Sequence, residues 1–315
     1  MAQASDPHQE WLSSLTDKGR TNYLENVEGL DCLKCHAEVG EEWRHSLHAI
    51  AWTDEHYQKS LTKVRRKNSC YGCHAPTDLA GTDLTKKPPV RSEQRHLGIH
   101  CASCHLDSDG VTILGPAGHA TDAHPSRKSE LFDSETSSKM CIACHETTIG
   151  PVIGIARDFE DTEQQDLGLS CVGCHMPGLR RSWANDEDGT PGPVRKSHSH
   201  RLETPRDPVF LRSAFLLSAK RDGEATVFRI ENQIGHRVPG LKERKIQFDI
   251  ELFDAVGDSV ATAEHVIDHR AYLPVEESFE MRLEAVGSRL MMKATHTTPA
   301  LSRGVVFWER EFTFE

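Results

Sequence analysis

Apolar and polar residues alternate along the last third of the chain. Four runs carry this period-two pattern, at residues 224–231, 245–253, 279–284 and 305–314. Because successive side chains of a strand point to opposite faces of a sheet, the pattern predicts half-buried strands. Residues 255–258 (Ala-Val-Gly-Asp) predict a turn between two of these strands. We therefore expect a β-sandwich of roughly 100 residues in this part of the chain.

The first two thirds of the chain lack such regular runs. Residues 41–58 have a helical pattern, with Trp43, Leu47 and Ile50 on one stripe. The pair Pro88-Pro89 and residues 185–193 are typical of loops. The sequence thus predicts an α+β protein. Residues 1–207 would form short helices and loops, and residues 208–315 an all-β, immunoglobulin-like sandwich.

Composition shows what fills the first region. Hydrophobic residues make up 37% of the chain and aromatic residues only 6%, which is little material for a core of side chains. In contrast, the chain has ten cysteines and nineteen histidines. This usage indicates a bound group and not a purely structural role.

All ten cysteines occur in one pattern, Cys-x-x-Cys-His, which is the attachment sequence of c-type haem. The two thiols bond to the porphyrin, and the adjacent histidine binds the iron as proximal ligand. Disulfides or four-cysteine zinc sites would not explain a histidine after every second cysteine, and thioredoxin-like motifs occur singly. The five motifs are Cys32–Cys35–His36, Cys70–Cys73–His74, Cys101–Cys104–His105, Cys141–Cys144–His145 and Cys171–Cys174–His175.

The sequence therefore predicts five covalent haems c, with iron, within residues 1–207. The gaps between motif starts are 38, 31, 40 and 30 residues, so every second motif lies 69, 71 or 70 residues apart. This alternation suggests a repeated two-haem unit. The haems themselves would form the core of this region, because each buries more apolar area than any side chain.

Charge and hydropathy restrict the partners and the compartment. A formal net charge of −11 argues against binding to nucleic acid, whose phosphates require a surplus of Lys and Arg. No apolar stretch is long enough for a membrane span. Since haem c is attached outside the cytoplasm, we expect export to the periplasm or the extracellular space. Ala2-Gln3-Ala4 is similar to the end of a cleaved signal peptide.

Several segments resemble multihaem cytochromes c related to cytochrome c554. One segment is Trp43-Arg-His-Ser-Leu-His48-Ala49, which follows the first motif as Trp-x-x-Ser-x-His-Ala does in that family. Asn232–Gly240 resembles the Gly-His-x-x-Pro-x-Gly segment at the start of the family's β domain, without its Thr after Pro. The other similar segments are Gly98–His105, Ile113–Pro116, Ala123–Pro125, Gly168–Pro177 and His200–Asp207, the last with Leu202 and Thr204 in place of the family's Phe and Gly.

The resemblance implies distal iron ligands at His48, His124, His200 and His236. For the fifth ligand we predict His96, whose place five residues before Cys101 is similar to that of a distal histidine in pentahaem nitrite reductases. His119, His198 and His45 are rivals for this role. We expect His265, His269 and His296 to be surface or core residues of the β region.

Three functions remain open from the sequence. Two histidines on each iron leave no site for substrate, and without a methionine ligand they favour low potentials, so the first expectation is an electron-transfer protein and not an enzyme. The first alternative is a reductase of nitrite, hydroxylamine or a sulfur oxyanion with one open iron. The second is a subunit of an extracellular conduit or filament. Donor and acceptor proteins are not identified, and self-association through haem edges or β edges is an expectation.

Overall fold

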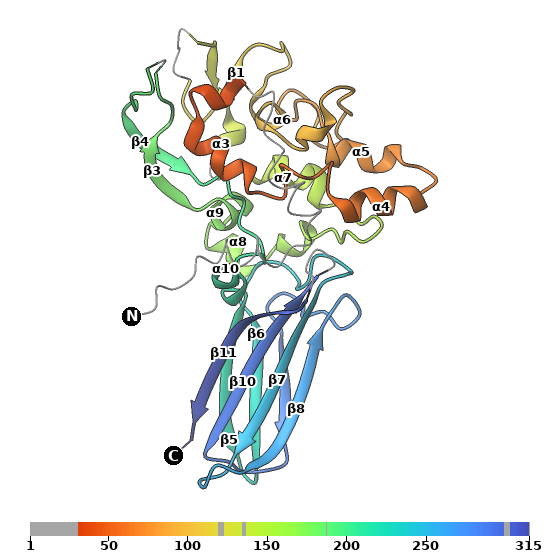
Figure 1. Ribbon diagram of the computed structural model, residues 1–315, viewed down its shortest axis with the longest axis vertical. Coiled ribbons are helices and arrows are strands. Elements are labelled where there is room, and N and C mark those ends of the chain that lie inside the picture. Colours follow the sequence, from red (N-terminus) through yellow and green to blue (C-terminus); the bar gives the residue numbers. More distant parts are fainter. Residues whose placement is uncertain (1–30, 119–122, 134–136, 187, 299–302, 315) are drawn as a thin grey trace. The chain divides into compact units, whose positions relative to one another are not determined.

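The structure is a computed structural model of the 315-residue chain. It describes residues 31–314 except 119–122, 134–136, 187 and 299–302. These residues form two compact units (Figure 1). We call residues 31–145 and 168–203 the motif unit, and residues 146–167 and 204–314 the sandwich unit. The sequence predicts a single boundary at residue 207, whereas the structure adds residues 146–167 to the sandwich unit.

Short helices and two small sheets make up the motif unit. The parallel pair β1 (Ile113–Gly115) and β2 (Ser126–Lys128) and the antiparallel pair β3 (Gly178–Ser182) and β4 (Val194–His198) are its two sheets within the described residues. Residues 185–193, predicted as a loop, connect β3 to β4. The helices are η1 (Asp31–Lys34), α3 (Ala37–Arg44), α4 (Glu55–Lys63), α5 (Asn68–His74), η2 (Arg95–Leu97), α6 (Cys101–His105), η3 (Glu130–Phe132), α7 (Ser138–His145) and α9 (Cys171–His175).

The helix predicted over residues 41–58 is interrupted. Helix α3 ends at Arg44, and turns connect it to α4, which begins at Glu55. Asp54 caps the start of α4, since its side chain accepts the backbone N–H of Tyr57 at 2.8 Å. The carbonyl of Ala51 accepts a hydrogen bond from the ring of His74 at 2.5 Å. The prediction was wrong at this point because carbonyls between the two helices serve residues elsewhere in the unit, which periodicity does not reveal.

The predicted sandwich is present in the sandwich unit. A four-stranded sheet has the order β11-β10-β7-β8, and a three-stranded sheet has the order β5-β6-β9, with antiparallel neighbours in both. The four predicted runs correspond to β6, β7, β9 and β11, and the predicted turn joins β7 to β8. The strands are β5 (Phe215–Asp222), β6 (Ala225–Asn232), β7 (Lys245–Phe253), β8 (Ser259–Ile267), β9 (Ser278–Leu283), β10 (Arg289–Thr297) and β11 (Val305–Thr313).

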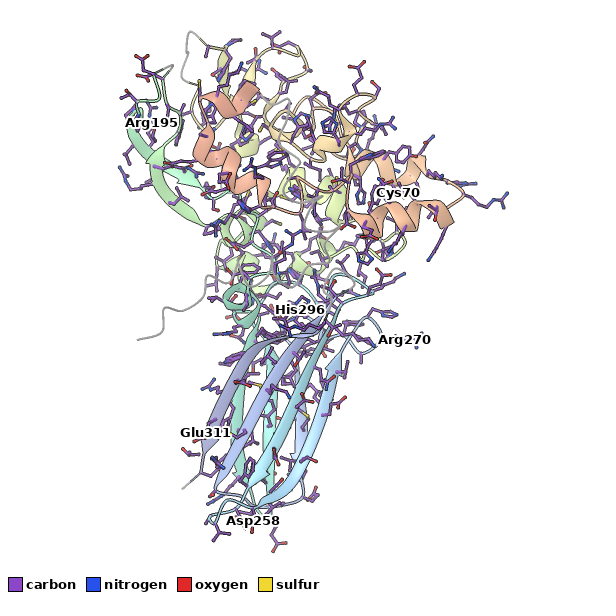
Figure 2. All side chains as sticks on the ribbon, viewed as in Figure 1. Cys70, Arg195, Asp258, Arg270, His296 and Glu311 are labelled. Atoms are coloured by element: carbon purple, nitrogen blue, oxygen red, sulfur yellow. The ribbon has the colours of Figure 1, made fainter. Side chains whose placement is uncertain are left out.

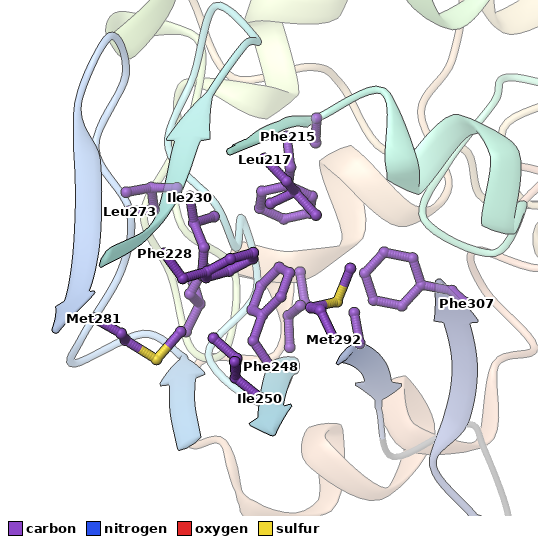
Figure 3. Packing of buried hydrophobic residues seen from close by; sticks show 14 of the residues in the cluster. Phe215, Leu217, Phe228, Ile230, Phe248, Ile250, Leu273, Met281, Met292 and Phe307 are labelled. Carbon is purple, nitrogen blue, oxygen red and sulfur yellow. The ribbon is translucent and has the colours of Figure 1, made fainter. Parts of the chain in front are cut away.

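Alternate residues of these strands fill the core of the sandwich (Figure 3). Along β7, Ile246, Phe248, Ile250 and Leu252 are buried, whereas their neighbours are partly or fully exposed. The rings of Phe215 and Phe248 meet edge to face at 5.4 Å. The sandwich unit therefore has the side-chain core that its alternating sequence predicts.

Residues 146–167 are held by the loop that follows β6. This segment contains η4 (Arg157–Phe159) and α8 (Glu163–Asp166), and α10 (Pro208–Arg212) precedes the first strand of the sandwich. The backbone N–H of Ile153 donates to the carbonyl of Gly240 at 3.2 Å, and the N–H of Lys242 donates to the carbonyl of Pro151 at 2.9 Å.

Among the described residues, no helix is both long and apolar enough to cross a membrane.

Candidate functional site

Each Cys-x-x-Cys-His motif lies on one turn of helix. Helices α5, α6, α7 and α9 all end at the histidine of their motif. The first motif begins within η1 and ends just before α3, and the backbone N–H of His36 donates to the carbonyl of Cys32 at 2.9 Å, as in an α-helix. Because residues three and four positions apart share one face of a helix, both thiols and the imidazole of a motif point to the same side.

The cysteines of different motifs lie against one another, and none of the ten forms a disulfide. Cys32 lies next to Cys101 and Cys73 next to Cys144, which links the first motif to the third and the second to the fourth. Cys141 likewise lies next to Cys171, which links the fourth motif to the fifth.

Backbone carbonyls fix the ring orientation of four motif histidines. A carbonyl can only accept, so each Nδ1 carries the proton and each Nε2 keeps a lone pair for a metal. This is the usual arrangement of a metal-binding histidine. The Nδ1 atoms donate as follows: His36 to Trp183 at 2.6 Å, His74 to Ala51 at 2.5 Å, His105 to Leu114 at 2.8 Å and His175 to Glu203 at 2.6 Å.

Burial favours the neutral form of several imidazoles in this unit. It lowers the pKa of His48 to about 3, with further lowering from His145, His175 and His74. It lowers the pKa of His200 to about 4, and the neighbouring His105 adds to the effect. Burial also lowers the pKa of the motif histidines His74, His105 and His145. A neutral imidazole is the form that binds a metal.

Three motif histidines face three of the predicted distal histidines. The ring centroids are 6.4 Å apart for His36 and His124, 6.3 Å for His48 and His145, and 6.2 Å for His105 and His200. The two rings of each pair are tilted by 30°, 32° and 31°.

These separations fit one metal ion between the two rings. Imidazole nitrogens bind metals at about 2 Å, so two such nitrogens on opposite sides of one ion place their ring centroids roughly 6 Å apart. Together with the paired thiols on the same helix face, the residues fit haem c with two axial histidines at the first, third and fourth motifs.

Comparison with known proteins agrees with this geometry. Residues 31–106, which contain the first three motifs, match the family described as Cytochrome c554 and c-prime. Over 86 residues, the chain is 29% identical to cytochrome c3 of Desulfovibrio desulfuricans. The aligned segment covers 23% of this chain and 83% of that protein. The chain is thus a multihaem cytochrome c, and its first three motifs are similar to the cytochrome c554 family. The family match contains two of the segments that carried the sequence resemblance, Trp43–Ala49 and Gly98–His105.

The fold of the cytochrome has a counterpart among solved structures. A penta-heme cytochrome c552 from Thermochromatium tepidum superposes with a TM-score of 0.62 over 90% of this chain and 97% of that chain, at 16% sequence identity. At this level of identity the likeness concerns the fold, and it extends over both units.

Two contacts of the Trp43–Ala49 segment hold His48 in place. The indole N–H of Trp43 donates to the carbonyl of Ile99 at 2.8 Å, and the N–H of Ile99 donates to the carbonyl of His48 at 2.9 Å. Gly98 has a φ of +58°, and a Cβ there would overlap the carbonyl oxygen of His48. The cytochrome therefore needs glycine at position 98 to bring the two segments together.

His200 is held by a residue next to Trp43. The Glu42 carboxylate accepts the backbone N–H of His200 at 2.8 Å and pairs with Arg181 at 2.8 Å. The side chain of Arg181 is only 7% exposed, so this ion pair is well shielded from water. Nδ1 of His200 lies 3.0 Å from the carbonyl of His198, which leaves Nε2 facing His105.

The second motif has different surroundings. The ring of His74 stacks on Tyr57 at 3.5 Å with the planes 6° apart. Trp52 lies 5.9 Å from Tyr57, and the guanidinium of Arg95 lies 5.1 Å over Trp52. The hydroxyl of Tyr57 is buried with no hydrogen-bond partner among the described residues, and burial raises its pKa. Thus a phenol and a cation, which the sequence did not point to, lie beside the second motif.

The candidates for the fifth ligand differ in how they are placed. His96 is exposed at the surface of η2. His198 is also exposed, but its Nδ1 lies 2.7 Å from the carbonyl of Met176, which leaves Nε2 free. Nδ1 of His45 lies 2.7 Å from the carbonyl of Glu41. His119 lies outside the described residues, so the choice of His96 stays a prediction.

His236 lies in a braced loop of the sandwich unit. The Asn232 side chain donates to the carbonyls of His236 at 3.0 Å and Pro274 at 2.8 Å. Next to His236, Arg237 binds both carboxylate oxygens of Asp158, at 2.6 and 2.7 Å. These contacts hold the loop on both sides of His236. The role of His236 as an iron ligand stays a prediction.

The histidines of the β strands have other surroundings. His296 is 4% exposed within β10, and the ring of His265 stacks on Phe279 at 3.5 Å. These are the core and surface roles expected from the sequence.

The hydrogen-bond partners of the ligand histidines that could not be predicted are mostly backbone carbonyls, which leave no signal in a sequence. Glu42 and Asn232 could have been found only as polar residues near a predicted ligand, and Asp158 lies too far from His236 in the sequence to be found in this way.

Proposed function

We propose that the cytochrome is an exported electron-transfer protein with five covalent haems c. The single observation that supports this most is the set of three histidine pairs with ring centroids 6.2–6.4 Å apart. Two axial imidazoles fill both free positions of an iron, so such a centre exchanges electrons and does not bind substrate. Haem c, when bound, supplies reversible one-electron oxidation and reduction of its iron.

The remaining two motifs carry the same attachment residues. The second and fifth motifs have both cysteines and an Nδ1-anchored histidine, His74 and His175. For these two motifs, His236 and the fifth-ligand candidates are the distal residues that we propose. The contacts between cysteines support closely spaced centres within two groups, the first with the third motif and the second with the fourth and fifth, because each cysteine would be attached to the edge of its porphyrin.

Histidine pairs and enclosure in the protein set the potentials. Methionine ligation raises a haem potential, and none of the paired ligands is methionine. We therefore propose low potentials for the first, third and fourth centres. The periplasm or the extracellular space follows as location from the chemistry of haem attachment.

Mass and spin state test this function together. The intact mass should exceed that of the polypeptide by five haems, and the mass increment should survive acid–acetone extraction. Electron paramagnetic resonance of the oxidised protein should show at least three low-spin centres with two histidine ligands. Four or fewer haems in fully matured protein, or fewer than three such centres, would contradict the proposal.

A second candidate is a reductase with an open iron at the second motif. The observation that favours it is that, among the described residues, the ring of His74 contacts Tyr57 and not a second histidine. Carbon monoxide binds ferrous haem only where one axial position is open. A carbon monoxide band in the reduced protein, altered by Tyr57→Phe, would support this function, and a spectrum unchanged by carbon monoxide would exclude it.

A further inference from the structure

A run of cations stands beside the second motif of this acidic protein. Between Glu55 and Asp78 the sequence has no acidic residue, although the net charge of the chain is −11. Lys63 is the last residue of α4, and Arg65, Arg66 and Lys67 lie between α4 and α5; all four are exposed. We call these four residues the basic patch.

The basic patch is joined directly to the residues that attach haem. The carbonyl of Lys67 accepts the N–H of Cys70 at 2.9 Å, and the carbonyl of Arg66 accepts the N–H of Ser69 at 3.0 Å. Figure 2 labels Cys70 on α5, where the neighbouring side chains extend away from the ribbon. The ammonium of Lys87 donates to the carbonyls of Asn68 and Ser69, which adds a further cation at the start of α5.

The cations of the patch are not neutralised within the described part of the chain. Nearby lysines do have partners, since Lys59 pairs with Glu55 at 2.8 Å and Lys86 pairs with Asp83 at 3.0 Å. No ion pair is found between any residue of the patch and an acidic residue that the structure describes. Most runs of charge are simply solvated. This run differs because its charge opposes that of the whole chain and because it borders a redox centre.

The second motif has one cysteine contact to another motif. Cys73 lies next to Cys144, whereas the fourth motif also contacts the fifth through Cys141 and Cys171. A centre with one such neighbour, beside an exposed charged surface, is where a second protein can approach.

We propose that the basic patch docks an electron-transfer protein with an acidic surface, and that electrons enter or leave the cytochrome at the second motif. This inference rests on the proposed electron-transfer function and names the class of partner. Complementary charges steer association and fix the orientation of two proteins more than they add affinity. The patch therefore acts mainly on the rate of encounter.

Charge reversal with a matched control tests the docking. The patch variant is Lys63→Glu, Arg65→Glu and Lys67→Glu. The control variant is Lys220→Glu, Lys242→Glu and Arg270→Glu, three exposed cations of the sandwich unit, so both variants have the same net charge. Reduced flavodoxin, an acidic electron carrier, is mixed with the oxidised cytochrome at about 10 mM ionic strength, where charges act over roughly 30 Å.

The expected result is a difference between the two variants. The patch variant should lower the second-order rate constant by about tenfold or more, and the control should stay within about twofold of the wild type. High salt should remove most of the difference. Equal losses in both variants would show a net-charge effect and overturn the proposal, as would no loss in either.

Two further measurements keep this test separate from the proposed function. Reduction by dithionite should proceed equally in all three proteins, and their intact masses should show equal numbers of haems. If even the wild type lacks haem or is not reduced, the electron-transfer function itself fails. Should the patch variant fail to mature, the neutral variant Lys63→Gln, Arg65→Gln and Lys67→Gln replaces it and should show a smaller loss of the same sign.

Discussion

At the scale of single residues, the orientation of each imidazole determines what it can bind. The Nδ1 of His105 donates to a carbonyl, which leaves Nε2 for a metal. Nδ1 of His100 instead accepts the backbone N–H of Ala102 at 3.1 Å, so in the neutral ring Nε2 carries the proton. His100 is therefore a helix cap and not a ligand, although it lies only one residue before Cys101.

Removing His48 should open one iron. We expect His48→Ala to convert one haem to high-spin and to leave the others low-spin, because His145 loses the ring that faces it at 6.3 Å. Electron paramagnetic resonance of the oxidised variant measures this change. Added imidazole should restore the low-spin signal. A low-spin spectrum identical to that of the wild type would show that His48 is not a ligand.

Burial of His296 should make the sandwich unit sensitive to acid. Desolvation, with a further contribution from Arg244, lowers the pKa of His296 from 6.5 to about 3. The unfolded chain therefore takes up a proton below about pH 6.5 that the folded chain does not, and stability is lost as the pH falls from there. Between pH 7 and pH 5 we expect a loss of about 2 kcal/mol from this residue.

A variant isolates this contribution. In His296→Leu the change in urea midpoint between pH 7 and pH 5 should be smaller than in the wild type. Met292→Leu, a buried substitution in the same strand, should keep the full pH dependence. If His296→Leu and the wild type respond equally to pH, burial of His296 has no role in acid sensitivity.

At the scale of elements, short segments position the ligands, and only some of these segments could be recognised from the sequence. The Trp43–Ala49 segment could be recognised because its residue types are distinctive. The break between α3 and α4 could not, since it depends on carbonyls such as Ala51 that serve His74. Alternation predicted β6, β7, β9 and β11 because one face of each is buried. It did not reveal β5, β8 or β10, although β10 also alternates between buried and exposed residues.

Gly98 should prove necessary for the placement of His48. In Gly98→Ala the new methyl group would meet the carbonyl oxygens of His48 and Ala49, and the positive φ adds strain. We expect a loss of stability of about 1–3 kcal/mol and a rise in the high-spin fraction of one haem. Urea unfolding and electron paramagnetic resonance measure the two effects.

Gly110→Ala is the matched control. Gly110 also has a positive φ, of +72°, but a Cβ there would meet no atom within 4 Å. It should lose stability without any change of spin state. A high-spin signal of equal size in both variants would show that contact with His48 is not the cause.

At the scale of the whole molecule, the two units depend on different kinds of core. Side chains such as Phe228, Phe248 and Phe307 fill the sandwich unit. In the motif unit few large apolar side chains are fully buried, and Leu97 is one of them. Composition predicted this contrast, because aromatic residues are scarce and cysteine motifs are frequent.

The assignment of residues 146–167 to the sandwich unit could not be predicted from composition. It depends on a few backbone hydrogen bonds and the Asp158–Arg237 ion pair.

Truncation should expose the segment between the fourth and fifth motifs. A chain that ends at Glu203 lacks Gly240 and Arg237, which hold Ile153 and Asp158. We expect limited proteolysis to cleave this chain within residues 146–167, whereas the full chain is protected there. The masses of the haem-containing fragments locate the cut. Equal resistance in both chains would show that the segment is ordered without the sandwich.

The place of residues 146–167 in the sandwich unit also constrains the order of assembly. Asp158 precedes its partner Arg237 by 79 residues, so a chain exported from its N-terminus presents the segment well before the loop that holds it. The fifth motif follows in the interval between them. The segment that joins the fourth motif to the fifth therefore reaches its final contacts only after the loop that follows β6 is in place. Folding of the sandwich thus sets the time at which the connection between these two motifs is fixed.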